Sequence, residues 1–218
     1  MPDYTFSKNI DTASRVPDSF QIPWQFANIE RAISSIDRPH LFNIGWVYEL
    51  LLGKGKRYLG GSPVLSALLG GFQVDGPFSA SDGLPLTIRQ RNTNLILPAQ
   101  RPDVVDPKNL SGKVKQPFFA GAARRWLITP DDPAFPFKPS SNLGLGNVGR
   151  NTSREPGFWN LNVSLFREFR VTERVRFELR FEASNALNQV NYPEPSTDID
   201  SANYGLNTAA AAAPPQIR

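Results

Sequence analysis

Two alternating runs between Phe158 and Leu187, joined by a short polar turn, constrain this chain most. Successive side chains of a strand point to opposite faces, so each run predicts a strand with one apolar face. A helix would spread the Arg and Glu residues around every side. The apolar phase contains Trp159, Leu161, Val163 and Leu165 in the first run, and Val175, Phe177, Leu179 and Phe181 in the second. The opposite phase of the second run is wholly charged: Arg174, Arg176, Glu178, Arg180 and Glu182.

This antiparallel hairpin is compatible with a soluble half-buried sheet, but its length also matches a membrane. A tilted strand needs about 9 to 11 residues to cross a bilayer, and each apolar run is about that long. The apolar phase then faces lipid. The charged phase faces the water-filled lumen of a barrel, where opposite charges on neighbouring strands neutralise one another. We therefore interpret the charged ladder as structural.

Other segments repeat the alternation less cleanly. Leu41 to Leu50 predicts a strand, and Gly70 to Arg91 predicts a long strand with a kink near Asp82-Gly83 and a bulge or kink at Pro77, which cannot donate to a ladder. The run DYTFSKNI predicts the end of another strand. Three long segments are rich in Pro, Gly, Asn and Ser and are predicted to be loops: about Asp11 to Ile36, Asn92 to Pro156 and Asn188 to Pro215.

Composition excludes most enzyme and cofactor chemistry. The chain has no Cys and a single His, His40, so thiolate catalysis, zinc cages and His-based triads are not expected. The segment GKGK lacks the spacing of a phosphate-binding loop and predicts a turn. The 24 basic and 20 acidic residues are scattered, so no nucleic-acid surface is expected. We expect no catalytic residues, no cofactor and no metal, and we expect the loop aromatics Trp126, Phe135 and Phe137 to pack the loop on itself.

Several ordered motifs carry a family resemblance. They are YTFSKNID, IDRPHLFNIGWVYEL followed by GKGKRYL, LLGGFQVDG, RPDVV, and GNVGRNTSREPGFWNLNVSLFREFRVTERVRFELRFEASNALNQVNY. In order and approximate spacing, from Tyr4 to about Gly205, the chain resembles the C-terminal part of a TonB-dependent outer-membrane receptor. The most similar type is the Oar-like group, which carries a carboxypeptidase-regulatory-like domain at its N-terminus.

The resemblance implies a fold and a set of partners. The fold would be all-β, namely the last strands of a 22-stranded antiparallel transmembrane barrel with long extracellular loops, in the outer membrane of a Gram-negative bacterium. The barrel would enclose a plug domain and take up a scarce solute with a TonB-type energising protein. The strands Leu41 to Leu50 and Phe158 to Phe169 would run inward, Leu51 to Leu68 would be a periplasmic connection, and Arg170 to Glu173 a periplasmic turn. Since about five strands cannot close a barrel, we expect residues 1–218 to be a fragment incomplete at both ends.

Two alternatives stay open. The same barrel could serve as a surface adhesion or carbohydrate-interaction protein, because the N-terminal domain of Oar-like proteins resembles carbohydrate-binding sandwiches. A soluble β-sandwich binding module is the other alternative, and it requires the apolar strand faces to bury one another.

Overall fold

The computed structural model describes residues 1–12, 30–53, 55–58, 61, 63–91, 100–120, 123–141 and 145–207. Its contacts divide the chain into two compact units. The strand unit comprises Met1–Tyr4, Leu41–Ala80 and Trp159–Gln189. The loop unit comprises Thr5–His40, Ser81–Phe158 and Val190–Arg218.

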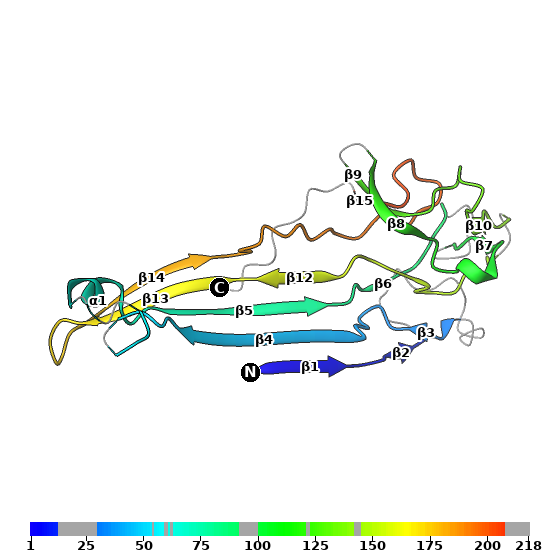
Figure 1. Ribbon diagram of the computed structural model, residues 1–218. Helices are drawn as coiled ribbons and strands as arrows, with labels where there is room; N and C mark the ends of the chain where they lie inside the picture. Colours follow the sequence, from blue (N-terminus) through cyan, green and yellow to red (C-terminus); the bar gives the residue numbers. More distant parts are fainter. Residues whose placement is uncertain are drawn as a thin grey trace. The chain divides into compact units, whose positions relative to one another are not determined.

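One antiparallel sheet dominates the strand unit. Its strands follow the order β1-β4-β5-β13-β14, and β12 pairs with β5 (Figure 1). This order confirms the all-β, antiparallel prediction. Within the described residues the sheet is open, with β1 and β14 as its edges. The strands are β1 (Pro2–Phe6), β4 (His40–Glu49), β5 (Gln73–Ser81), β12 (Phe158–Leu161), β13 (Val163–Arg170) and β14 (Arg176–Ala183).

The predicted hairpin is β13 and β14. Its register pairs Leu165 with Phe181 and Phe169 with Phe177, so the two predicted apolar phases share one face. The turn is shifted relative to the prediction, because the carbonyl of Val175 accepts hydrogen bonds from the amides of Val171 and Thr172. Arg174 and Val175 therefore lie in the turn and not in the strand, which corrects their predicted positions. The second strand ends at Ala183, four residues before the predicted end.

The strand β4 confirms the predicted strand at Leu41 to Leu50. It keeps one register along β5, since the amide of Leu50 donates to the carbonyl of Phe72 and the amide of Asp82 donates to the carbonyl of His40. The predicted long strand from Gly70 to Arg91 is not continuous: β5 ends at Ser81, just before the predicted kink at Asp82-Gly83, and residues 85–86 pair in a different sheet. The irregularity expected at Pro77 falls on the neighbouring chain segment, where Asn162 separates β12 from β13.

That irregularity has a clear steric origin. The amide of Asn162 donates to the carbonyl of Pro77 at 3.1 Å, so the segment stays in register although it is not part of a strand. A Cβ atom on Gly76 would lie 2.0 Å from the carbonyl oxygen of Asn162. Only glycine therefore allows β5 to approach the β12–β13 junction this closely.

The connection between β4 and β5 contains a helix that the sequence interpretation missed. Helix α1 (Pro63–Leu69) lies inside the segment assigned to a plain periplasmic connection, and β5 begins at Gln73 and not at Gly70. Gly71 has φ +76°, a conformation that ends the helix, and the amide of Gly70 closes its last turn on the carbonyl of Ser66. The turn predicted at GKGK is confirmed for the described residues by the bond from the amide of Lys56 to the carbonyl of Gly53.

The loop unit is more ordered than predicted. The segments assigned to loops contain several two-stranded ladders and one three-stranded sheet of order β15-β9-β8. Residues 13–29, 92–99, 121–122, 142–144 and 208–215 of those predicted loops lie outside the described residues. The elements are β2 (Ile10–Asp11), β3 (Ala32–Ile33), β6 (Pro85–Leu86), β7 (Asp103–Val104), the 3-10 helix η2 (Pro107–Asn109), β8 (Lys113–Ala120), β9 (Ala123–Leu127), β10 (Phe137–Lys138), β11 (Ser153–Arg154) and β15 (Leu206–Asn207).

A small apolar core explains this order. Six buried side chains from segments far apart in the sequence pack together, so the predicted loops have an interior of their own. The core consists of Ile88, Leu127, Phe137, Val148, Ile199 and Tyr204. In the described residues, no helix is long and apolar enough to cross a membrane.

Candidate membrane-facing surface

One face of the sheet in the strand unit is apolar, and we call it the apolar face. Because directly paired residues share a side, the registers place Val74 of β5, Leu165 of β13 and Phe181 of β14 together on it. The side chains of this face are open to the surroundings: Phe177 is 56% and Phe181 58% exposed. Water-soluble proteins rarely leave a contiguous apolar surface uncovered, so this face is a candidate for contact with a membrane or with another protein segment.

Aromatic side chains mark the apolar face at two levels. The first aromatic row is Phe42, Phe78 and Trp159. The ring centroids of Phe42 and Phe78 lie 6.1 Å apart, and those of Phe78 and Trp159 lie 6.3 Å apart. The second row joins Phe169 and Phe177, with centroids 6.2 Å apart. Rows of aromatic residues at two levels are typical of the interfaces of membrane-spanning barrels.

The opposite side is the charged face. Across the strands, Arg176 of β14 pairs with Glu168 of β13 at 3.2 Å. Along β14, the guanidinium of Arg180 lies 2.8 Å from Glu178 and 3.5 Å from Glu182. In this arrangement Arg176, Glu178, Arg180 and Glu182 lie on one face and form ion pairs. Because all four side chains are well exposed, the pairs contribute little stability and keep the surface wettable.

Phe166 also lies on the charged face. The register pairs it with Arg180, whose guanidinium carbon lies 5.0 Å from the centre of its ring. This cation–π contact covers the ring with a charged group, so an aromatic residue is accommodated on a polar surface.

The loop unit buries charges that the strand unit keeps exposed. Glu30 receives two hydrogen bonds from the guanidinium of Arg101, at 3.0 and 3.1 Å, and both side chains are only 2% exposed. Arg150 donates to the carbonyl of Glu30 and to the carboxylate of Asp11. Burial lowers the pKa of Arg101, and the nearby charge of Glu30 opposes that shift. This cluster joins four separate segments of the loop unit, which contribute Asp11, Glu30, Arg101 and Arg150.

A second buried carboxylate, Asp37, lies beside Arg154. Its carboxylate accepts a hydrogen bond from the amide of Asn9 at 2.7 Å and another from the guanidinium of Arg154. Burial raises the pKa of Asp37, but the hydrogen bonds from Arg154 and Asn9 and the charge of Arg154 outweigh it and hold that pKa below its usual value. Ionised Asp37 therefore joins the segments of Asn9 and Arg154 within the loop unit.

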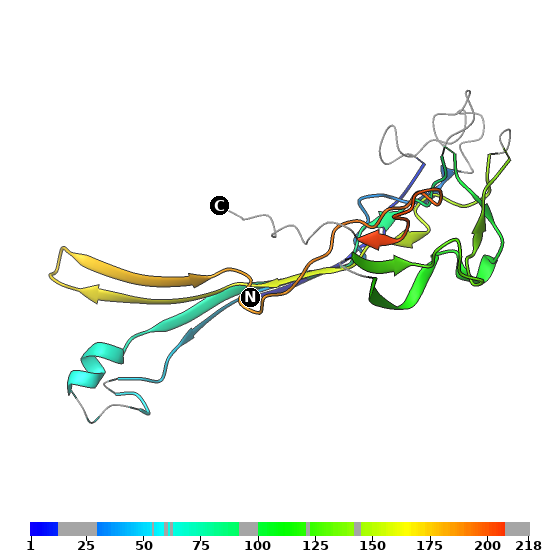
Figure 2. The same cartoon turned by 90° about the horizontal axis from the view of Figure 1, so that it is seen from above.

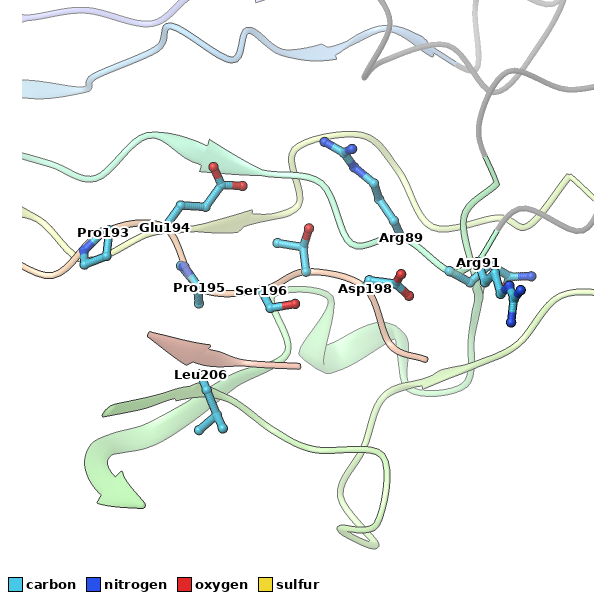
Figure 3. A pocket seen from close by; sticks show the side chains of 10 residues that line it. Arg89, Arg91, Pro193, Glu194, Pro195, Ser196, Asp198 and Leu206 are labelled. Carbon is cyan, nitrogen blue, oxygen red and sulfur yellow. The ribbon is translucent and has the colours of Figure 1, made fainter. Parts of the chain in front are cut away.

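The loop unit also has a surface hollow of about 730 Å³. Figure 3 shows Arg89 and Arg91 on one segment and Glu194 and Asp198 on the other. Its walls are joined by backbone bonds, from the amide of Arg89 to the carbonyl of Thr197 and from the amide of Ile199 to the carbonyl of Arg89. The hollow therefore offers charges of both signs on a fixed backbone.

The loop aromatics pack inward, which confirms the sequence interpretation. Phe137 is buried in the loop core, and Phe135 meets it edge to face at 5.6 Å between ring centres. Trp126 packs against the same core and donates its indole N–H to the carbonyl of Arg154 at 2.7 Å. The sequence analysis did not predict the buried partners Glu30, Arg101 and Arg150, because isolated charged residues in Pro- and Gly-rich segments are expected to be exposed to water.

Comparison with known proteins gives one match. A family model described as an outer membrane beta barrel domain matches residues 2–218. No curated protein and no solved structure matches the chain.

Proposed function

Because the chain belongs to the family of outer membrane β-barrel domains and lies in the outer membrane of a Gram-negative bacterium, we propose that it is part of a TonB-dependent receptor. The receptor is of the Oar-like type and takes up a scarce solute. The ordered motifs from YTFSKNID to NQVNY support this assignment beyond the family. The proposal gives the protein no catalytic activity and no cofactor.

The apolar face is assigned to lipid and the charged face to the lumen of the barrel. The two aromatic rows carry this assignment. From Trp159 to Phe169 the chain rises about 33 Å along the strand, and a tilt of about 40° reduces that to about 25 Å. This height equals the apolar band of outer-membrane barrels, which aromatic girdles flank at both interfaces. In such barrels short turns are periplasmic, so the hairpin turn between Arg170 and Arg176 faces the periplasm.

The open sheet supports a role within a larger barrel. Among the strands that the structure describes, β1 and β14 lie at the edges of the sheet, and the edge of a sheet cannot face hydrocarbon without a large cost in free energy. Further strands of the receptor pair with these edges in our proposal, and a plug domain fills the lumen beside the charged ladder. A TonB-type protein supplies the energy for uptake.

The loop unit is assigned to the extracellular side. Extracellular loops of these barrels are long, and the loop unit of this chain has a core, a buried ion cluster and a hollow with charges of both signs. A preformed surface of this kind loses little conformational entropy when a solute binds. The loop unit is therefore the part of this chain that contacts the solute.

The first test is to sequence the DNA on both sides of the reading frame. A frame that continues upstream into a plug domain and downstream into a final strand with a terminal aromatic residue supports the receptor. The second test measures solute uptake in the source bacterium with and without its TonB-type protein. Uptake that is unchanged when the energising protein is deleted would contradict active transport.

An adhesion or carbohydrate-interaction protein on the same barrel is the second candidate. The ordered loop unit favours it, because a surface with its own core can present a fixed binding face. Binding to cells or glycans that persists without the TonB-type protein, with no solute accumulating in the periplasm, would favour this candidate. A soluble sandwich is not retained, since the chain belongs to an outer-membrane family and its apolar face is exposed.

A further inference from the structure

Helix α1 exposes an apolar surface that the sheet does not explain. Val64, Leu68 and Leu69 are 68%, 62% and 44% exposed. With Leu65 they span about 140° of the helix circumference, so they form one continuous stripe. An exposed leucine stripe on a short helix is costly in water, and it indicates a nonaqueous contact.

The opposite side of α1 is fixed against the connecting loop. A Cβ atom on Gly53 would lie 2.7 Å from the Cα atom of Gly70, so the two glycine backbones are in direct contact. Ser66 lies on the same side, with its hydroxyl oxygen 3.5 Å from that position. Because this side is held by backbone contact, the apolar stripe cannot turn inward.

Arg167 ties the end of α1 to the apolar face of the sheet. The register pairs Arg167 with Leu179, which places it on the apolar face. Its guanidinium donates to the carbonyls of Leu68 and Ala67, at 2.7 and 2.8 Å, at the C-terminal end of the helix. Figure 2 shows α1 set to one side of β13 and β14. The apolar stripe therefore continues the surface that faces lipid.

The residues around α1 suit the boundary between hydrocarbon and headgroups. The guanidinium of Arg167 lies 4.2 Å from the ring centre of Phe169 and 5.5 Å from that of Phe72. Arg57 lies 5.5 Å from the ring centre of Tyr58, and both are exposed in the loop before the helix. Aromatic rings beside cationic groups are typical of this boundary, where the cations meet lipid phosphates.

We propose that α1 is an interfacial anchor that inserts Val64, Leu68 and Leu69 into the periplasmic leaflet of the outer membrane. Arg57 and Arg167 then contact the phosphate groups of its phospholipids. This proposal rests on the lipid assignment of the apolar face and not on solute uptake. It gives the β4–β5 connection a function, which is to fix the depth of the barrel in the membrane.

The test uses single cysteine variants, because the chain has no Cys of its own. Leu68→Cys places an environment-sensitive fluorophore on the stripe, and Ala67→Cys places it on the same helix outside the stripe. Both variants are introduced into the whole receptor, in which any Cys outside residues 1–218 is replaced by Ser, and the fluorophore is measured in outer membranes isolated from the producing cells. Quenching by nitroxide-labelled phosphatidylglycerol reports contact with lipid, and quenching by iodide reports contact with water.

An interfacial helix buries its apolar face about 5–10 Å into the boundary, so we expect lipid quenching to be about threefold stronger at Leu68→Cys than at Ala67→Cys. Iodide should show the reverse order. Equal iodide quenching at both sites would overturn the proposal. Protection of the Leu68→Cys label from both quenchers would also overturn it, since a protein segment would then cover the stripe. If Leu68→Cys is not inserted into the membrane, Val64→Cys replaces it with the same expected outcome. None of these readouts depends on solute uptake or on the TonB-type protein.

Discussion

Phe and Glu side chains that are exposed in the strand unit have buried counterparts in the loop unit. In the strand unit Phe177 and Phe181 are exposed, and Glu178 forms an ion pair at the surface with a side chain 49% exposed. In the loop unit Phe137 is 3% exposed, and the side chain of Glu30 is 2% exposed in its ion pair with Arg101. The difference shows that each unit is organised for a different solvent.

In the proposed assignment, lipid covers the apolar face, and the strand unit then does not need to bury these side chains against protein. A single sheet layer then suffices for the strand unit, because the surroundings of its apolar face replace a protein core. The loop unit has no such phase and must build an interior, yet its core of six residues is small. Its buried ion pairs join distant segments, and the removal of one partner would leave an uncompensated buried charge, so the loop unit is sensitive to the loss of a single charge.

Removing the buried carboxylate of Glu30 is expected to have the largest effect. Glu30→Ala leaves the buried guanidinium of Arg101 without its ion-pair partner and takes the nearby Glu30 charge from Arg150, and breaking a buried pair costs about 3–5 kcal/mol. The urea concentration at which the loop unit becomes sensitive to protease should fall sharply in outer membranes. The control Glu178→Ala breaks an exposed pair of the strand unit and should leave the transition unchanged. Equal shifts for the two variants would contradict the contrast between the units.

An arginine on the apolar face is expected to have the next largest effect. Phe181→Arg places a charge in the lipid band, where Arg costs about 2–4 kcal/mol near the midplane. Phe166→Arg makes the same chemical change on the neighbouring strand but on the charged face, where we expect about 1 kcal/mol. Urea unfolding of the whole receptor carrying either variant, in phospholipid membranes, measures the difference. Similar costs at the two positions would mean that the two faces are not lipid and lumen.

The sequence predicted the strand unit well because its signal is local. Alternation along each run determines which side of a strand a residue occupies, so the shared face of Leu165 and Phe181 followed from their positions alone. The family match supports the outer-membrane location. The turn was misplaced by about two residues because Arg174 and Val175 continue the alternation after the strand pairing has ended.

The loop unit could not be predicted in the same way. Its ordered structure depends on contacts between residues that are distant in the sequence, such as Glu30 with Arg101, and no local alternation of apolar and polar residues predicts such contacts. Helix α1 was missed for a different reason. The run from Pro63 to Leu69 is only seven residues long, and its leucines equally suit the end of a strand.

The smallest expected effect concerns acid, and it tests the second buried carboxylate. The pKa of Asp37 is lower in the folded protein than its ordinary value of 3.8, so the ionised form favours folding. The stabilisation of the folded state by ionised Asp37 is fully present above pH 3.8 and is lost as the pH falls through the lower pKa of Asp37 in the folded protein. Asp37→Asn should therefore destabilise the loop unit by about 1–3 kcal/mol at neutral pH, because Arg154 loses a charged acceptor.

The difference between wild type and Asp37→Asn should shrink as the pH falls below about 3.8, since protonation of Asp37 has the same effect as the substitution. Protease protection of the loop unit, measured in urea from pH 7 to pH 3, gives this difference directly. Arg154→Gln removes the main partner of Asp37, so the pKa of Asp37 rises towards its ordinary value. In that variant, the pH range over which the loop unit loses stability through protonation of Asp37 should be narrower than in the wild type. A gap between wild type and Asp37→Asn that stays constant down to pH 3 would show that the charge of Asp37 does not stabilise the loop unit. Phe181→Arg should keep the wild-type acid dependence of the loop unit, because Phe181 belongs to the strand unit.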